Sequence, residues 1–385
     1  MLAVLLTVLF GIVPQSGVVT HTALLEPAQH TLDLIYNMQF DEALHAAQGI
    51  IDQAPAHPAG YFCRAAVYWQ WRLIAREAPQ RAMLLRQFQE ATQRARAAAE
   101  RLPAAQATEA AFYLGAVYGM QARMHLVERQ LIKAFLAARQ GSNYLQQCVA
   151  QAPDWYDAYA GLGLYAYAVS RVPSFWRGMV QQFIGIAGDR EQGLQALEQA
   201  RTHGRLSAPE AASLLAKIYT LPDERQYAKA HALLEYLVQR YPNNIDYRYR
   251  LAVVSAYLGL WDRARQVGRE LVVDIEHDKP YPARQWLPLL QYRLAETYVL
   301  QREQLQQAVK SLTALRTQDL NPALRAWVDL RLGNVHDLRG ERQAAQAWYR
   351  EVKGDEDAEA LAQSYMTLPF TLAQMELKPL EYAAL

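Results

Sequence analysis

The feature that most constrains the fold of this chain is a large residue followed by a small one, which recurs inside helical patterns. The small residue of this pair is found at Gly163, Ala216, Ala252, Ala295 and Gly333. A second series of small residues is found at Ala230, Ala264, Ala308 and Ala345. Two helices cross closely only where one of them lacks a bulky side chain, and self-similarity at about 34 residues or somewhat more is typical of helix–turn–helix arrays. The sequence therefore predicts stacked pairs of antiparallel helices.

The composition favours the same fold and excludes other classes of protein. Hydrophobic residues make up 52% of the 385, which excludes a disordered chain. The 39 Lys and Arg are balanced by 38 Asp and Glu, so the basic surplus of a nucleic-acid-binding protein is missing. Alternating runs of Val, Ile and Thr, which are typical of strands, are also missing. We expect an all-α protein, an α-solenoid of about eight tetratricopeptide-like repeats with insertions.

Prolines and changes of pattern set the expected domain boundaries. Residues 1–23 contain the apolar run LAVLLTVLFGIV, whose length fits a signal peptide although no Lys or Arg precedes it. We expect an exported protein, periplasmic or outer-membrane-associated, or a cytoplasmic one if this segment is not a signal. Divergent helical repeats are expected over 24–153, more regular repeats over 154–355, and a capping helix with a tail over 356–385.

Three stretches together resemble a known family. They are GLGLYAYAVSRVP, GDREQGLQALEQA after an apolar insert, and LRLGNVHDLRGERQAAQAWYREV. They look like bacterial relatives of the tetratricopeptide repeat protein 39 family, and the turn Gly188, Asp189 and Arg190 is the most specific part of the likeness. The resemblance covers roughly Asp154–Phe370. It implies a helical-repeat scaffold without known catalysis, and it supplies no ligand.

The first helix of each repeat in such an array lines a concave groove, which commonly holds a peptide. Tyr and Arg are well suited to hold a partner, because they combine contact area with hydrogen-bond donors. We therefore predict a protein or peptide partner at polar first-helix positions, with solvated faces as the simpler interpretation of each. These positions are Asp246, Tyr249, Arg250, Tyr292, Arg293, Glu296, Arg331, Asn334 and Asp337.

A second candidate contact is the apolar insert at 172–188. Its Phe175, Trp176 and Phe183 either fold over a neighbouring repeat or meet a partner or membrane surface. Asp189 in the following turn is expected to cap the next helix by accepting backbone N–H bonds. The insert gives an alternative function, that of a peripheral membrane protein.

The sequence carries no recognised signature of catalysis or of metal binding. The sequence contains no HExxH, Walker loop, GxSxG or Cys/His metal spacing, so we expect no cofactor, no metal and no catalytic residue. The stretch DIEHD at Asp274–Asp278 is interpreted as a polar turn. Cys63 and Cys148 are expected to be small buried residues, although a disulfide stays open. The second alternative is a helical-repeat enzyme or accessory domain, which a deep pocket with converging histidines and carboxylates would favour.

Overall fold

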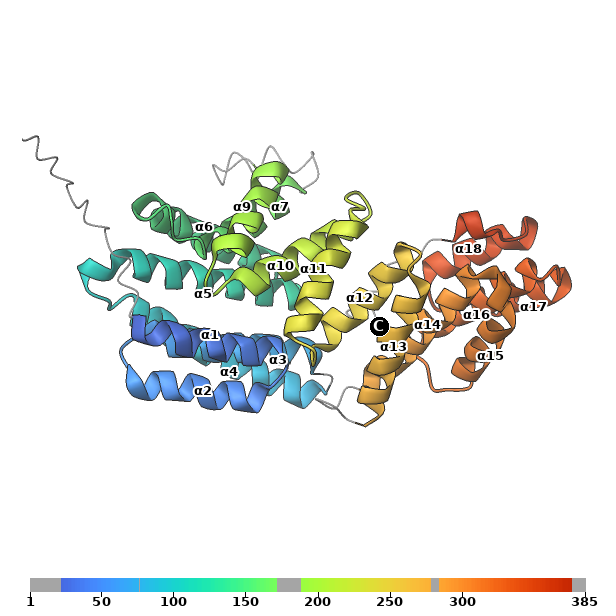
Figure 1. Ribbon diagram of the computed structural model, residues 1–385, viewed down its shortest axis with the longest axis horizontal. Coiled ribbons are helices and arrows are strands. Elements are labelled where there is room, and N and C mark those ends of the chain that lie inside the picture. Colours follow the sequence, from blue (N-terminus) through green and yellow to red (C-terminus); the bar gives the residue numbers. More distant parts are fainter. Residues whose placement is uncertain (1–21, 76, 172–187, 278–283, 376–385) are drawn as a thin grey trace, which may run out of the picture. The chain divides into compact units, whose positions relative to one another are not determined.

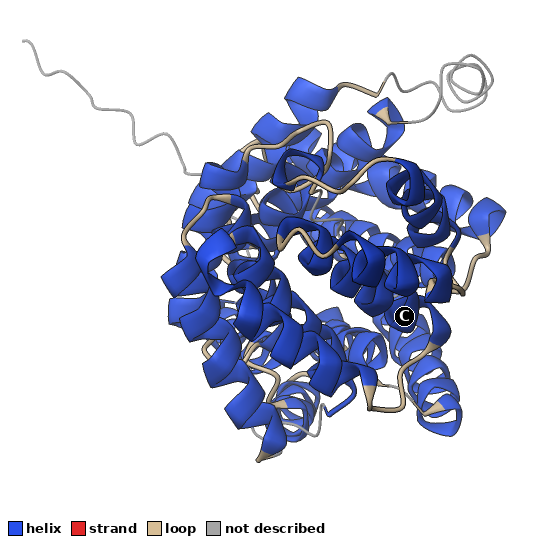
Figure 2. Ribbon diagram, turned by 90° about the vertical axis from the view of Figure 1, so that its right-hand side faces the viewer, coloured by secondary structure: helices blue, strands red, loops and turns tan. Residues whose placement is uncertain are grey.

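The computed structural model describes residues 22–75, 77–171, 188–277 and 284–375, and its regular elements are all helices (Figures 1 and 2). The α-helices are α1 (Thr22–Tyr36), α2 (Phe40–Gln53), α3 (Pro58–Ile74), α4 (Ala78–Ala99), α5 (Ala107–Val127), α6 (Leu131–Gln151), α7 (Ala158–Ser170), α9 (Arg190–His203), α10 (Ala208–Tyr219), α11 (Tyr227–Arg240), α12 (Ile245–Tyr257), α13 (Trp261–Glu276), α14 (Leu287–Leu300), α15 (Leu305–Arg316), α16 (Pro322–Leu338), α17 (Arg342–Glu351) and α18 (Glu356–Thr367). Short 3₁₀ turns are found at η1 (Ala104–Gln106), η2 (Arg284–Trp286), η3 (Arg302–Gln304) and η4 (Leu372–Gln374).

The chain divides into two compact units. Unit 1 comprises residues 1–32, 43–69 and 86–208, and unit 2 comprises 33–42, 70–85 and 209–385. In unit 1, α5 packs on α6, α6 on α7 and α7 on α9. In unit 2, each helix from α11 to α18 packs on the next one along the chain. The expected succession of packed helix pairs in an all-α protein is therefore confirmed.

The pair α7 and α9 shows why small residues recur. A Cβ atom added to Gly163 would lie 2.7 Å from the carbonyl oxygen of Gly193 and 2.8 Å from the nitrogen of Leu197. Conversely, a Cβ atom on Gly193 would lie 2.7 Å from the nitrogen of Tyr167. The two backbones approach so closely that no larger side chain fits between them, as the sequence pattern predicts.

Local sequence signals set the helix boundaries of unit 2. The side chains of Asn244, Asn321 and Asp355 each accept a hydrogen bond from the backbone N–H three residues on, which caps α12, α16 and α18. Gly259 and Gly340 follow α12 and α16 with φ of +73° and +77°, a conformation that glycine adopts at little cost. These residues turn the chain from the first helix of a pair into the second.

Each unit has its own apolar core. The core of unit 1 joins Leu24 and Ala28 of α1 to residues from α2 to the start of α7, among them Cys63, Phe112 and Trp155. One core cluster of unit 2 runs from Tyr292 of α14 to Phe370 and includes every residue of α16 from Ala326 to Val328. Because α16 is buried on all sides between Ala326 and Val335, its polar residues must find partners inside the protein.

Two expectations fall outside the described residues. The first is the signal segment, of which residues 1–21 are not described, and the second is the insert with Phe175, Trp176 and Phe183. Within the parts of the chain that are described, no helix is both long and apolar enough to cross a membrane. Cys63 and Cys148 are buried and not bonded to each other.

Candidate functional site

Most of the polar residues predicted to line a groove are buried within unit 2. Asp246 and Arg250 of α12 stay partly exposed, and they bond to each other at 2.9 Å. The residues that are no more than 8% exposed are Tyr249, Tyr292, Arg293, Glu296, Arg331 and Asn334. These six side chains lie inside unit 2, and Tyr249, Arg293 and Glu296 line a small cavity bordered by α12 and α14. A role for the six in binding a partner stays a prediction. Whether Asp246 and Arg250 meet a partner stays a prediction.

Glu296 of α14 is the centre of a buried polar network. It accepts hydrogen bonds from the Tyr292 hydroxyl at 2.8 Å, from Arg293 Nη1 at 2.5 Å and from Arg331 Nε at 2.9 Å. Burial by itself raises the pKa of Glu296, but the two guanidinium groups outweigh it, and the pKa lies below its ordinary value. Arg293 Nε also donates to the Tyr249 hydroxyl at 3.3 Å. Glu296 thus ties α14 to α16, and Arg293 ties α14 to α12.

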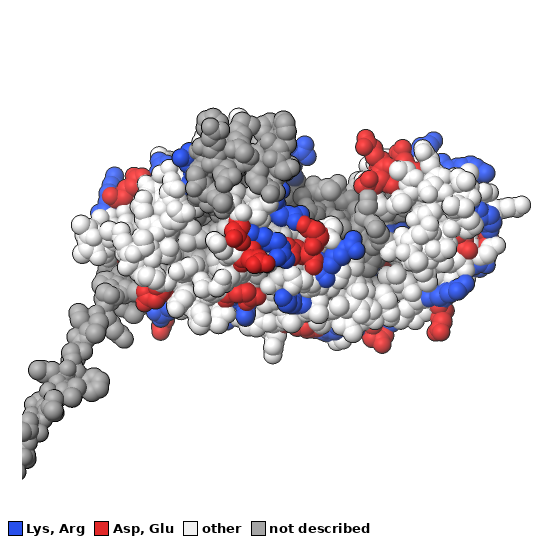
Figure 3. Space-filling view, turned by 90° about the horizontal axis from the view of Figure 1, so that it is seen from above, with Lys and Arg blue, Asp and Glu red and all other residues white. Residues whose placement is uncertain are grey.

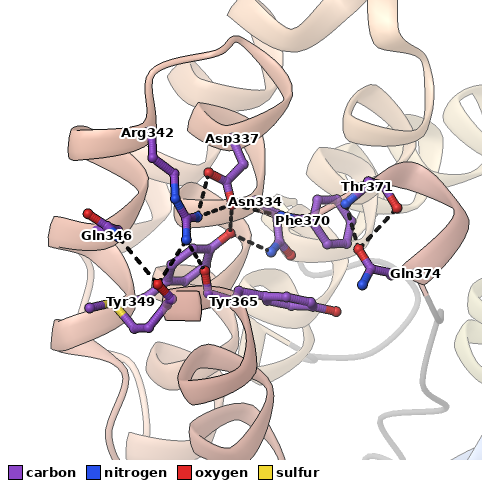
Figure 4. A network of polar contacts seen from close by, with 10 residues as sticks. Asn334, Asp337, Arg342, Gln346, Tyr349, Tyr365, Phe370, Thr371 and Gln374 are labelled. Carbon is purple, nitrogen blue, oxygen red and sulfur yellow. Dashed lines mark hydrogen bonds and ion pairs between the residues drawn. The ribbon is translucent and has the colours of Figure 1, made fainter. Parts of the chain in front are cut away.

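The network continues through α16 to the C-terminal end of the described chain. Arg331 Nη1 donates to Asn334 Oδ1 at 2.9 Å, and Asn334 Nδ2 donates to the Tyr349 hydroxyl at 3.1 Å. That hydroxyl in turn donates to Asp337 Oδ2 at 2.8 Å (Figure 4). Desolvation, together with the hydrogen bond to Asp337, raises the pKa of Tyr349 well above its ordinary value. The chain of bonds therefore runs from one helix pair to the next.

Asp337 closes this network against the last helix. Arg342 Nη1 lies 2.9 and 3.0 Å from the two Asp337 oxygens, and the backbone N–H of Phe370 donates to Oδ2 at 2.8 Å (Figure 4). Arg342 Nη2 donates to the carbonyl oxygens of Tyr365 and Met366. The Asp337 side chain is fully buried, so this residue fastens α18 and the segment after it and presents no surface for a partner.

A cavity of about 230 Å³ lies within unit 1, where sequence reasoning predicted no site. Its walls come from five separate stretches of the chain. They are Leu24, Leu25, Ala28, His57, Glu109, Phe112, Tyr113, Asp154, Trp155, Tyr156, Asp157, His203, Arg205 and Leu206. More than half of these residues are apolar or aromatic and the rest carry polar or charged groups, which is the usual make-up of a ligand pocket.

His57 and Glu109 form the buried polar wall of this cavity. His57 Nε2 lies 3.1 Å from Glu109 Oε1, and both side chains are almost fully buried. His57 Nδ1 accepts a hydrogen bond from the backbone N–H of Ala59 at 3.2 Å, which helps to begin α3. Both ring nitrogens of His57 are therefore engaged, one by the Ala59 N–H and one by the Glu109 carboxylate.

Asp157 shapes another part of the cavity wall. Its Oδ1 accepts hydrogen bonds from the backbone N–H groups of Leu206 and Ser207, each at 2.8 Å, and from the Ser207 hydroxyl at 2.9 Å. These bonds hold the turn after α9 against the start of α7. The same turn is fastened to α1, because Gln29 Nε2 donates to the Arg205 carbonyl oxygen at 2.9 Å.

Aromatic rings surround the polar groups. The Phe112 and Trp155 rings lie 5.5 Å apart, and Phe112 and Tyr113 lie 5.2 Å apart. The Tyr156 ring lies 4.8 Å from the exposed His203 ring. The cavity therefore has a packed aromatic lining, and its exposed polar groups lie at the edge.

Sequence reasoning missed this cavity because its walls converge only in the folded chain. The stretch DWYD at 154–157 lies where one expected repeat ends and the next begins, and neither Glu109 nor His57 belongs to a motif. One signal was available: two acids enclose two aromatic residues at Asp154–Asp157, directly after a proline that ends a helix. A helix–helix junction that carries aromatic and acidic residues is a place where a pocket can form.

The predicted turn before α9 and the DIEHD stretch make local contacts. Asp189 Oδ1 accepts the backbone N–H of Gln192 at 3.0 Å and caps α9. In the DIEHD stretch, Asp274 pairs with Arg248 at 2.6 Å and His277 Nδ1 contacts the Val273 carbonyl oxygen at 2.7 Å. Among the described residues, no group of three His, Cys, Asp or Glu is placed to hold a metal ion.

Charges of both signs are mixed on the face drawn in Figure 3, as the balanced composition suggests. No family model matches the chain, and no curated protein matches it. The resemblance to the tetratricopeptide repeat protein 39 family therefore stays a prediction, next to the confirmed architecture of sequential helix pairs.

Proposed function

We propose that this chain is a non-catalytic scaffold of tetratricopeptide-like helix pairs that binds a protein or peptide partner, and that the cavity of unit 1 anchors a side chain of that partner. The observation that supports this most is the cavity itself. About 230 Å³ is room for one large side chain, and aromatic walls with a few polar groups are typical of anchor pockets. The polar residues of unit 2 are less suited to this role, because they already bond to one another.

The same convergence of histidines and carboxylates is the pattern that favours the alternative of a helical-repeat enzyme. A general base needs a ring nitrogen free to accept a proton from the substrate. His57 uses one nitrogen toward Glu109 and the other toward the Ala59 N–H. Asp157 Oδ1 is occupied by three donors. These bonds suit His57 and Asp157 to binding better than to catalysis.

Two further parts of the proposal rest on sequence alone. Export rests on the apolar run at the start of the chain, and the membrane-docking alternative rests on Phe175, Trp176 and Phe183 of the insert. Neither is needed for peptide binding in unit 1.

The proposal is tested by selecting peptides from a random display library on the full chain. The variant Ala28→Phe fills the cavity, because Ala28 of α1 lines it and is 3% exposed. Ala314→Phe, at an exposed position of α15, is the matched control. Both variants are first checked for helical content and cooperative melting.

We expect selected peptides to bind the parent chain and Ala314→Phe alike and to lose about tenfold or more in affinity for Ala28→Phe. Equal binding to all three proteins would place the peptide site elsewhere and overturn the proposal. The absence of any selected peptide would also count against it. Substitution of Tyr249 or Arg293 is a poor test of binding, since either change removes a buried, bonded group.

A further inference from the structure

We propose that the cavity of unit 1 receives a cationic group, the guanidinium or ammonium of an Arg or Lys side chain. The inference deepens the proposed function by giving the chemistry of the anchor, and it rests on that function only for the claim that the cation belongs to a peptide. It is carried by the charges, the buried carboxylate and the aromatic walls of one cavity.

Carboxylates outnumber permanently charged basic groups on the cavity walls, which also carry the histidines His57 and His203. Glu109, Asp154 and Asp157 contribute three carboxylates, whereas Arg205 contributes the one group that is always charged. Arg205 is exposed, and among the described residues its guanidinium forms no ion pair with any of the three carboxylates. The walls thus favour a positive ligand over a negative one.

Glu109 is the most deeply buried carboxylate of the cavity walls. It is 3% exposed, and a buried carboxylate is costly unless a positive group or several donors compensate it. Its Oε1 faces His57, and its Oε2 has a long contact of 3.5 Å with Gln106 Nε2. Oε2 therefore keeps most of its capacity to accept a hydrogen bond from a group that enters the cavity.

His57 faces the other oxygen of the same carboxylate, since its Nε2 lies 3.1 Å from Glu109 Oε1. The entering cation is therefore placed at Oε2, on the side away from the histidine.

The aromatic walls suit the same ligand. A cation over the face of Trp, Tyr or Phe within about 6 Å is attracted by the ring quadrupole, most strongly where water is excluded. Trp155, Phe112 and Tyr113 are each buried and line the cavity beside Glu109. A guanidinium can stack on such a ring while its N–H groups reach a carboxylate. An anion would meet the same carboxylates without compensation.

Isothermal titration with paired small probes tests the inference. N-acetyl-arginine amide is compared with N-acetyl-citrulline amide, its neutral isostere, and N-acetyl-lysine amide with N-acetyl-norleucine amide. The full-length parent chain is compared with Glu109→Gln and with Glu100→Gln, an exposed acid of the same unit. Asp154→Asn removes an exposed wall carboxylate and serves if Glu109→Gln does not fold.

We expect each cationic probe to bind about tenfold or more tightly than its neutral partner, and this preference to disappear in Glu109→Gln while it persists in Glu100→Gln. Asp154→Asn should weaken the cationic probes by a few-fold only, because that carboxylate is solvated. Equal affinities for arginine and citrulline probes, or an unchanged preference in Glu109→Gln, would overturn the inference.

The two proposals fail in different ways. Selected peptides that bind the cavity through a neutral residue would leave the proposed function standing and refute the cation. Cationic probes that bind with the expected dependence on Glu109, when the display library yields no peptide, would leave the cation site standing and refute the peptide scaffold.

Discussion

Replacing Glu296 by glutamine tests how unit 2 is held together. The substitution preserves shape but removes the negative charge that compensates two buried guanidinium groups. Arg293 Nη1 and Arg331 Nε lie 2.5 and 2.9 Å from the two carboxylate oxygens. The glutamine side chain would keep one acceptor oxygen, while its amide NH₂ would point at an arginine donor. The variant therefore leaves at least one buried guanidinium without a counter-charge.

The expected loss of stability follows from the burial of all three groups. Glu296 is 1% exposed, and Arg293 and Arg331 are 8% and 2% exposed. Removing one partner of a buried ion pair typically costs about 3–5 kcal/mol, since the other charge stays in the interior. An exposed pair contributes about 0–1 kcal/mol. We therefore expect Glu296→Gln to lower the free energy of unfolding by about 3–5 kcal/mol.

Hydrogen exchange read by mass spectrometry measures this loss where it arises. Peptides from α14 and α16 of the variant should exchange faster than those of the parent chain, by a factor that corresponds to the lost free energy. Glu303→Gln, at an exposed position after α14, is the control and should exchange like the parent. A loss below about 1 kcal/mol in Glu296→Gln would refute the view that this carboxylate holds the helices together.

The same carboxylate predicts a pH dependence. Burial raises the pKa of Glu296, Arg293 and Arg331 lower it by more, and the net folded-state pKa lies below its ordinary value. The stabilisation is therefore complete above the unfolded-state pKa of about 4.3 and is lost as the pH falls through the lower folded-state pKa. Glu296→Gln should lack this contribution, so the stability difference between parent and variant should shrink in acid.

Three further predictions concern close packing, buried thiols and the C-terminal network. Gly163→Ala should lower the free energy of unfolding by about 1–3 kcal/mol in urea denaturation, because its Cβ meets backbone, whereas Gly119→Ala, which meets nothing within 4 Å, should raise it by about 0.5–1 kcal/mol. Burial raises the pKa of both Cys63 and Cys148 to about 12, so neither thiol should react with a disulfide reagent at about pH 8 until the chain is unfolded. Tyr349→Phe should lower the melting temperature through a loss of about 1–3 kcal/mol, since Asp337 and Asn334 both lose a partner.

The helix pairs could be predicted from sequence because their signals are local. Leu162 beside Gly163 marks the first helix of a pair, and Gly193 marks the second. Caps such as Asp189 are also local, because the side chain bonds to a backbone group three residues on. Such signals can be recognised without knowing which helix pairs become neighbours in the folded chain.

The burial of the polar residues could not be predicted in this way. Arg331 has the same position in its helix as Arg293 and Arg250, directly before a Leu and a small residue. The helical period places all three on one face, but it does not show whether that face meets solvent or the next helix. The bond from Arg331 to Glu296 joins residues 35 positions apart, which is close to the length of one repeat. It forms only because the first helices of two consecutive pairs stack on each other. The cavity of unit 1 depends on the meeting of five distant stretches.

The most direct test of the partner-binding cavity is a cross-linking measurement. A display-selected peptide carrying a benzophenone next to its anchor residue is irradiated with the full chain, and the attachment points are located by mass spectrometry. We predict attachment to the cavity walls, at residues 24–28, 109–113 and 154–157. Attachment to α12, α14 or α16 of unit 2 instead would contradict the account and restore the groove as the site.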